Sequence, residues 1–133
     1  MYTISKSFQF SAAHHLVGLA EDHPCMRVHG HNYTVIVELT DNKTNETGFV
    51  KDYRELSKVK EYIDEVLDHR DLNLVFNGTE IREDSSRYFN PTAENMAKYF
   101  FMVFSAWYPQ LSAVSVKETD KTIARYTPEF DEQ

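Results

Sequence analysis

Apolar and polar side chains alternate along two long stretches of the chain, which predicts two half-buried β-strands. In residues 2–14, one face carries apolar side chains and a terminal histidine, namely Ile4, Phe8, Phe10, Ala12 and His14. In residues 29–39, two histidines and then apolar side chains share one face, namely His29, His31, Tyr33, Val35, Val37 and Leu39. The first strand therefore ends with a histidine on its apolar face, and the second strand begins with two.

Helical spacing of apolar side chains predicts two amphipathic helices later in the chain. The first begins after Asp52, an N-cap residue followed three positions later by Glu55, and ends at the pair Asp68-His69. Its apolar positions are Tyr53, Leu56, Val59, Ile63, Val66 and Leu67. The second begins at residues 90–92. Its apolar stripe, which we interpret as core, consists of Ala93, Met96, Ala97, Phe100, Phe101, Phe104 and Trp107.

Two further strands are predicted at residues 111–119 and 123–126, and a long polar loop with a short strand near Ile81 at residues 77–90. The order strand, strand, helix, helix, strand, strand indicates an α+β fold with a four-stranded antiparallel sheet and both helices on one face. We expect a single domain that spans residues 1–133. The two open edges of such a sheet favour aggregation, and closure into a barrel by self-association would remove them.

Composition and charge narrow the class of protein. The formal net charge of -7 argues against nucleic acid as a partner, whereas a phosphorylated small molecule needs only a few local Lys or Arg side chains. A single cysteine excludes an internal disulfide and fits a reducing compartment. We find no signal-peptide pattern at the N-terminus and no apolar stretch of about 20 residues. We therefore expect a cytoplasmic protein that does not bind a membrane.

Histidines are concentrated in one part of the sequence, since five of the six lie between positions 14 and 31. If the first two strands form a hairpin, the end of one meets the start of the other, and His14 lies beside His29 and His31. Three protein ligands with an open fourth position are typical of catalytic zinc. The sequence thus predicts a Zn²⁺ site, the alternative being that these histidines are scattered surface or core residues.

Several short segments occur in an order that resembles one known family. They are Phe10-Ser11-Ala12-Ala13-His14, Cys25 with His29-Gly30-His31, Gly48-Phe49-Val50-Lys51-Asp52-Tyr53, Leu67-Asp68-His69, Pro91-Thr92-Ala93-Glu94-Asn95 and Val116-Lys117-Glu118-Thr119. Together they resemble the 6-pyruvoyl-tetrahydropterin synthase / 6-carboxytetrahydropterin synthase family. The resemblance implies the tunnelling fold (T-fold), in which the four-stranded sheets of a trimer join into one β-barrel. It also implies a hexamer of two stacked trimers, with active sites at subunit interfaces.

The resemblance assigns roles to the histidines and to the cysteine. His14, His29 and His31 match the zinc ligands of the family. Cys25 matches a catalytic cysteine whose thiolate acts as a general base on the substrate side chain. A thiolate is favoured beside zinc and a protonated histidine. The alternative for Cys25 is an ordinary small buried residue.

Further matches concern proton transfer and the pterin ring. Asp68 and His69 match an acid/base pair, although the same residues also commonly end a helix. Thr92 and Glu94 fall where the start of the second helix contacts the ring in the family, and both are equally well explained as helix-start residues.

Glu118 matches the carboxylate that anchors the pterin ring. Its position in the third strand shares the apolar face, where an unpaired carboxylate is costly. Adjacent N–H and amino groups of a pterin offer this carboxylate two parallel donors. The alternative is a core carboxylate paired with Arg125 or Lys121.

The spacing of these motifs refines the expected activity. Three residues separate Cys25 from His29, as in the bacterial 6-carboxytetrahydropterin synthases of the queuosine and deazapurine pathway, whereas animal members have five. We expect a zinc-dependent lyase that acts on 7,8-dihydroneopterin triphosphate. The alternative within the family is 6-pyruvoyl-tetrahydropterin synthesis, and a rival of another class is a non-catalytic zinc module with Cys25 as fourth ligand. Residues 77–90 and 120–126 match no usable pattern, so the triphosphate-binding residues stay unassigned.

Overall fold

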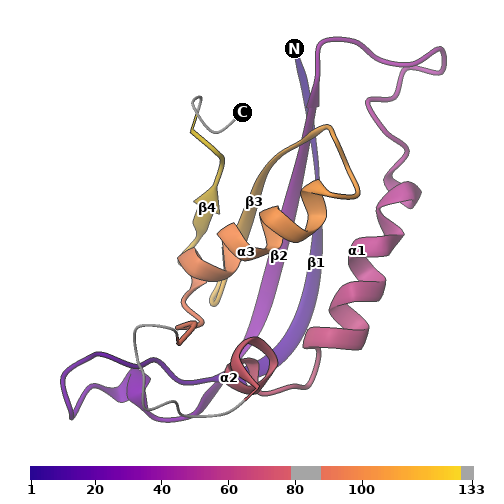
Figure 1. The fold of residues 1–133 in the computed structure, drawn as a ribbon. Coiled ribbons are helices and arrows are strands. Elements are labelled where there is room, and N and C mark those ends of the chain that lie inside the picture. Colours follow the sequence, from indigo (N-terminus) through magenta and orange to yellow (C-terminus); the bar gives the residue numbers. More distant parts are fainter. Residues whose placement is uncertain (79–87, 130–133) are drawn as a thin grey trace.

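The computed structural model describes residues 1–78 and 88–129, and its centre is a four-stranded antiparallel sheet. The strands are β1 (Tyr2–His14), β2 (His29–Asp41), β3 (Leu111–Lys117) and β4 (Ala124–Tyr126). They lie in the order β1-β2-β3-β4 (Figure 1). The predicted sheet is therefore confirmed, with β3 two residues shorter at its end than the sequence pattern predicts.

The hairpin of β1 and β2 runs without interruption along both strands. Tyr2 lies opposite Asp41 at one end, and His14 lies opposite His29 at the other. On the opposite edge of β2, Thr34 lies opposite Lys117 of β3, and the register shifts once between Glu38 and Leu39. Because the register of β1 and β2 is continuous, the alternation of the sequence decides which side chains face the core.

The core lies between one face of the sheet and the helices. The helices α1 (Ser57–Tyr62), with the turns on either side of it, and α3 (Ala93–Ser105) pack on this inner face (Figure 1). Aromatic and aliphatic side chains from both layers are buried there, among them Phe10, Val35, Ile63 and Phe104. The aromatic stripe of α3 is therefore part of the core, as predicted.

The first predicted helix is confirmed in position but differs in form. A 3-10 turn (Tyr53–Leu56), α1 and a π-turn (Ile63–Leu67) follow one another. Asp52 caps its start by accepting a hydrogen bond from the backbone N–H of Arg54. In the π-turn, the backbone N–H of Asp68 donates a hydrogen bond to the carbonyl of Ile63, five residues earlier. This turn carries Asp68 to the edge of β1.

A short helix that the sequence pattern did not predict follows this segment. It is α2 (Leu72–Asn77), with Asp71 as its N-cap and Gly78, at φ 73°, as its C-cap. Six residues are too few for a periodicity to be recognised, so only the two caps signal it. The short strand expected near Ile81 lies outside the described residues.

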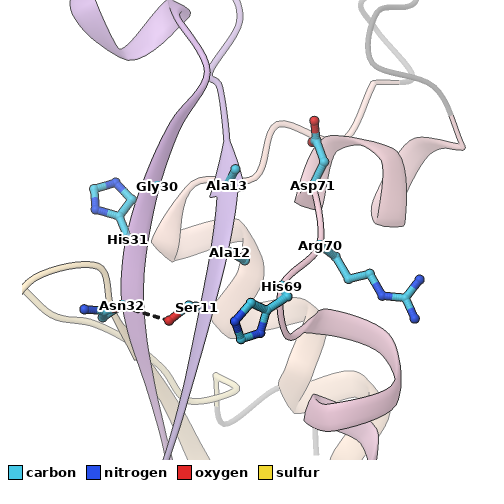
Figure 2. A pocket seen from close by; sticks show the side chains of 9 residues that line it. All are labelled: Ser11, Ala12, Ala13, Gly30, His31, Asn32, His69, Arg70 and Asp71. Carbon is cyan, nitrogen blue, oxygen red and sulfur yellow. Dashed lines mark hydrogen bonds between the residues drawn. The ribbon is translucent and has the colours of Figure 1, made fainter.

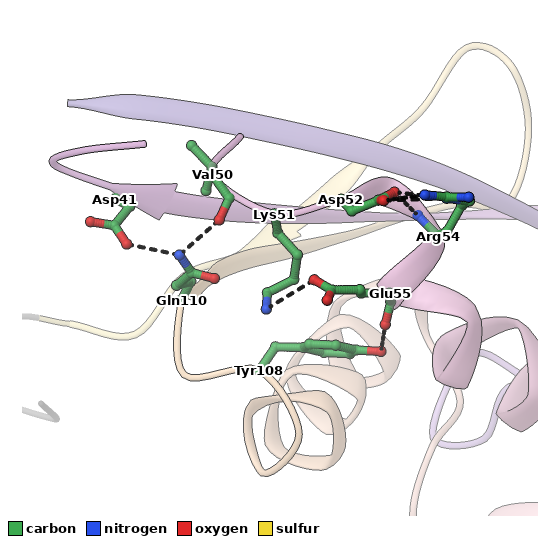
Figure 3. Close-up of polar contacts among 8 residues, drawn as sticks. All are labelled: Asp41, Val50, Lys51, Asp52, Arg54, Glu55, Tyr108 and Gln110. Atoms are coloured by element: carbon green, nitrogen blue, oxygen red, sulfur yellow. Dashed lines mark hydrogen bonds and ion pairs between the residues drawn. The ribbon is translucent and has the colours of Figure 1, made fainter. Parts of the chain in front are cut away.

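Polar contacts fix the connection from β2 to α1 (Figure 3). They lie at the end of β2 that carries Asp41, the opposite end from His29. The amide of Gln110 donates hydrogen bonds to Asp41 (2.8 Å) and to the carbonyl of Val50 (3.1 Å). The hydroxyl of Tyr108 donates to the carbonyl of Glu55 at 2.8 Å. No helix within residues 1–78 and 88–129 has the length and apolar character to cross a membrane.

Candidate functional site

Three histidines meet at the loop end of the β1–β2 hairpin, as strand parity predicts. His14 lies opposite His29, and His31 lies two residues further along the same face of β2. Their ring centroids are 4.6 Å (His14–His29), 4.9 Å (His29–His31) and 5.1 Å (His14–His31) apart. One ligand nitrogen from each ring lies within 4.8 Å of the other two, so the group can hold a metal ion.

Backbone carbonyls orient two of these imidazoles. Nδ1 of His14 donates to the carbonyl of Pro91 at 2.8 Å, and Nδ1 of His29 donates to the carbonyl of Arg27 at 2.7 Å. Because a carbonyl only accepts, both Nδ1 atoms carry the proton, and Nε2 of the neutral ring keeps its lone pair. In the described part of the chain, the buried Nε2 atoms of His14 and His31 have no hydrogen-bond partner. Metal-binding histidines are commonly held in this way.

Burial favours the neutral form of two of these imidazoles. It lowers the pKa of His14 from 6.5 to about 4, with His29 and His31 acting in the same direction and the Pro91 carbonyl opposing them. Burial also lowers the pKa of His31, and this outweighs the attraction of Glu118. Neutral imidazole is the form that binds a metal. At neutral pH these two rings can therefore bind one without first losing a proton.

Cys25 lies on the loop above the histidines but outside their group. It occupies the middle of a 3-10 turn, η1 (Pro24–Met26), and is half-buried. His23 caps this turn by accepting the N–H of Cys25 at 3.1 Å, and the carbonyl of Cys25 accepts the N–H of Leu16. Within the described residues the candidate metal group contains the histidines and not Cys25. This arrangement speaks against a closed four-ligand site.

A cavity of about 610 Å³ lies between the start of α3 and the β3–β4 connection. Glu118 and Glu94 both line it, as do Ala93 and Ala97 on α3. The side chain of Glu118 is 25 % exposed, and its carboxylate lies 3.8 Å from Nε2 of His31. Glu118 therefore joins the histidine group to a cavity large enough for a heterocycle.

Two expectations for this region need correction. Glu118 is only partly buried, because β3 ends one residue before it. The alternative pairing of Glu118 with Arg125 is wrong, since Arg125 forms a two-fold hydrogen-bonded ion pair with Glu38 on the outer face of the sheet. Thr92 is the N-cap of α3, accepting the N–H of Asn95 at 3.1 Å.

Asp68 and His69 lie at the edge of β1, not in the cavity with Glu118. The carboxylate of Asp68 accepts the N–H of Ser11 at 3.0 Å and pairs with Nδ1 of His69 at 2.9 Å. His69 has a φ of 59°, a conformation unusual for a residue with a side chain, and its side chain is 82 % exposed. Hydrogen bonds from Ser11 and then from His69 lower the pKa of Asp68.

A shallow hollow of about 520 Å³ at this edge is lined by His69 and His31 (Figure 2). In Figure 2 the two strands β1 and β2 pass between the His31 ring and the His69 ring. Within one chain, the structure thus brings the histidines and Glu118 together, whereas Asp68 and His69 lie at the edge of β1 and do not line the cavity of Glu118.

Sequence reasoning missed two asparagines that hold the loop after β1. The buried side chain of Asn73 accepts the N–H of His15 at 2.9 Å and donates to the His15 carbonyl at 3.0 Å. Asn90 does the same for Val17, at 3.1 and 3.2 Å. Each mimics a strand pairing with its amide. Local sequence gives no signal of these contacts, because the partners are 58 and 73 residues apart.

The sheet, the helices and the placement of the histidines define a protein of the tunnelling-fold (T-fold) class. The family model described as "6-pyruvoyl tetrahydropterin synthase" matches residues 3–129. The chain belongs to this family.

Relatives and solved structures agree with this membership. A 6-carboxy-5,6,7,8-tetrahydropterin synthase of Synechocystis sp. is 33 % identical over 135 residues, covering 95 % of this chain and 93 % of the relative. The enzyme of the same name from Bacillus subtilis is 28 % identical, with coverages of 96 % and 86 %. Among solved structures, 6-pyruvoyl tetrahydropterin synthase of Caenorhabditis elegans has a TM-score of 0.77 at 27 % identity and covers 96 % of each chain.

Proposed function

We propose that the protein is a zinc-dependent carbon–oxygen lyase that converts 7,8-dihydroneopterin triphosphate to 6-carboxy-5,6,7,8-tetrahydropterin. One water molecule is consumed, acetaldehyde and triphosphate are released, and the product serves as a precursor of queuosine and related deazapurines. The observation that carries the proposal is the group of His14, His29 and His31 beside Glu118 and its cavity. The relatives named 6-carboxy-5,6,7,8-tetrahydropterin synthase support the choice of reaction.

The histidines hold the metal, and Glu118 holds the ring. His14, His29 and His31 would hold a zinc ion, since one nitrogen of each ring lies within 4.8 Å of the other two. When bound, the cation makes a substrate hydroxyl more acidic by stabilising the negative charge that develops on its oxygen. The Glu118 carboxylate accepts the ring N–H and the neighbouring amino group, which fixes the substrate side chain on the side of the histidines.

Proton transfer is assigned to Cys25, Asp68 and His69. The Cys25 thiolate removes a proton from the substrate side chain, and His69, held by Asp68, exchanges protons with solvent at the exposed edge of β1. Since Asp68 and His69 do not line the cavity of Glu118 within one chain, we propose that the complete site is shared between copies in a trimer-based hexamer.

Product analysis tests the reaction. We expect zinc-loaded protein incubated with 7,8-dihydroneopterin triphosphate to yield the mass of 6-carboxytetrahydropterin together with acetaldehyde. The mass of 6-pyruvoyl-tetrahydropterin without acetaldehyde would instead establish the alternative activity. Absence of both products, with substrate unchanged, would refute a lyase.

A subunit-mixing experiment tests the shared site. His29→Ala and His69→Ala subunits should each be inactive alone, and mixed oligomers should recover part of the activity, because some sites then combine two intact halves. Sedimentation should give a hexamer of the 15.6 kDa chain. A monomer, or mixtures as inactive as their parts, would contradict the shared site.

Cys25→Ala separates the enzyme from the rival zinc module. We expect the variant to keep its zinc and its pterin affinity and to lose turnover, because Cys25 lies outside the histidine group. Loss of zinc in proportion to activity would favour a structural site with Cys25 as fourth ligand.

A further inference from the structure

The hydroxyl of Tyr33 is buried beside the histidines without a partner. Tyr33 is 0 % exposed, and among the residues that the structure describes nothing forms a hydrogen bond with its hydroxyl. Its ring contacts His31 and His14, with centroids 5.4 and 5.7 Å away, and stacks on Phe10 at 5.0 Å. Buried hydroxyls are nearly always hydrogen-bonded, so this one calls for a physical explanation.

Tyr33 and Glu118 lie on either side of His31, just beyond the paired part of β2 and β3. The pairing of these strands ends at Thr34 opposite Lys117, and Tyr33 and Glu118 are the next residues beyond this last pair. The Tyr33 ring centroid is 5.4 Å from that of His31, and the Glu118 carboxylate is 3.8 Å from Nε2 of the same ring. A donor without an acceptor and a carboxylate acceptor are thus neighbours around one imidazole.

The present contact of Glu118 is a weak one that metal binding removes. Its carboxylate lies 3.8 Å from Nε2 of His31, too far for a hydrogen bond. That same nitrogen is buried and has no hydrogen-bond partner among the described residues. A ring nitrogen that binds a metal ion carries no proton, so it would then donate nothing to Glu118, and the carboxylate would need another donor.

We propose that Tyr33 is a positioning residue, whose hydroxyl donates a hydrogen bond to the Glu118 carboxylate when the histidines hold their metal. The bond holds one carboxylate oxygen and so orients the carboxylate of Glu118 towards the cavity, where it can accept the ring donors. Burial, with Glu118 acting in the same direction, raises the pKa of Tyr33 far above neutrality, so the hydroxyl keeps its proton and acts as a donor. The inference rests on the proposed function in that Glu118 is taken as the ring anchor.

Tyr33→Phe removes only the hydroxyl and tests the proposal in the zinc-loaded protein. By calorimetry with neopterin as an unreactive probe, we expect about tenfold weaker binding, since one hydrogen bond to a charged group is lost. Zinc content should be unchanged. The melting temperature of the metal-free variant should not fall, because in that state the hydroxyl has no partner to lose among the described residues.

Tyr108→Phe is the matched control. This tyrosine is also buried, but its hydroxyl donates to the Glu55 carbonyl at 2.8 Å, far from the site (Figure 3). We expect this control to show the opposite pattern, a lower melting temperature with unchanged neopterin affinity. If Tyr33→Phe behaved like Tyr108→Phe, Tyr33 would be a structural residue and the proposal would be wrong.

A double-mutant cycle and a structure complete the test. In a Glu118→Gln background, Tyr33→Phe should weaken binding much less than tenfold, because the residue acts through the carboxylate. Equal effects in both backgrounds would show that Tyr33 does not act through Glu118 and would overturn the proposal.

Should the wild type bind no neopterin, the proposed function would fail. A crystal structure of the zinc-loaded protein would still decide the inference, by a Tyr33–Glu118 oxygen distance of about 2.5–3.0 Å or by a hydroxyl that points elsewhere.

Discussion

The ring of His14 lies 4.6 Å from the ring of His29, and these two residues form the last pair of the β1–β2 hairpin. Each is held by a backbone carbonyl through Nδ1, from Pro91 at the start of α3 and from Arg27 in the loop that carries Cys25. One pair of imidazoles thus connects the sheet, the segment that leads into α3 and the loop that carries Cys25.

His29→Ala should remove most of the bound zinc and nearly all activity while the protein stays folded, because two imidazoles hold the ion far less tightly than three. Metal analysis of the purified variant and its circular dichroism spectrum give the result. His69→Ala is the control and should keep its zinc, since His69 lies outside the histidine group. Full zinc occupancy in His29→Ala would refute the ligand assignment.

Glu118→Gln should bind pterins about 30- to 1000-fold more weakly and retain zinc. The substitution removes a negative charge and sets an NH₂ group against the ring donors, together costing about 2–4 kcal/mol. Calorimetric titration of variant and wild type with an unreactive pterin measures the difference. Equal affinities would mean that the ring is anchored elsewhere.

Asn73→Ala should lower the free energy of unfolding by about 2–4 kcal/mol, because it leaves both backbone groups of His15 unpaired in a buried place. Urea denaturation measures the effect. Exposed Asn42→Ala is the matched control and should change stability by less than about 0.5 kcal/mol. Similar values for the two variants would show that the two hydrogen bonds of Asn73 to His15 do not hold the loop.

Asp68 should contribute to stability in a pH-dependent way. Its folded-state pKa lies below the unfolded value of 3.8, because the Ser11 N–H and His69 favour the charged form. The unfolded chain therefore binds the proton first, and the contribution is present above pH 3.8 and lost as the pH falls through the lowered pKa. The stability difference between wild type and Asp68→Asn should shrink from pH 5 to pH 2 in urea denaturation. A difference that stays constant would contradict this.

The sequence alone determined β1, β2 and the meeting of the three histidines. A period of two decides which side chains share a face of a strand, and a hairpin joins the end of one strand to the start of the next. These are local rules, so His14, His29 and His31 could be placed together without coordinates. The cap at Asp52 and the apolar stripe of α3 were predicted for the same reason.

Only the tertiary structure decided which residues surround the three histidines. It showed α2, the π-turn before Asp68, the left-handed conformation of His69, the clamps of Asn73 and Asn90, and the buried hydroxyl of Tyr33. Alternation placed Tyr33 in the core but said nothing of its hydroxyl, because the surroundings of its side chain include rings from another strand, those of Phe10 and His14. Such contacts join residues tens of positions apart. Their geometry depends on how the sheet and helices pack, which no local pattern of residues contains.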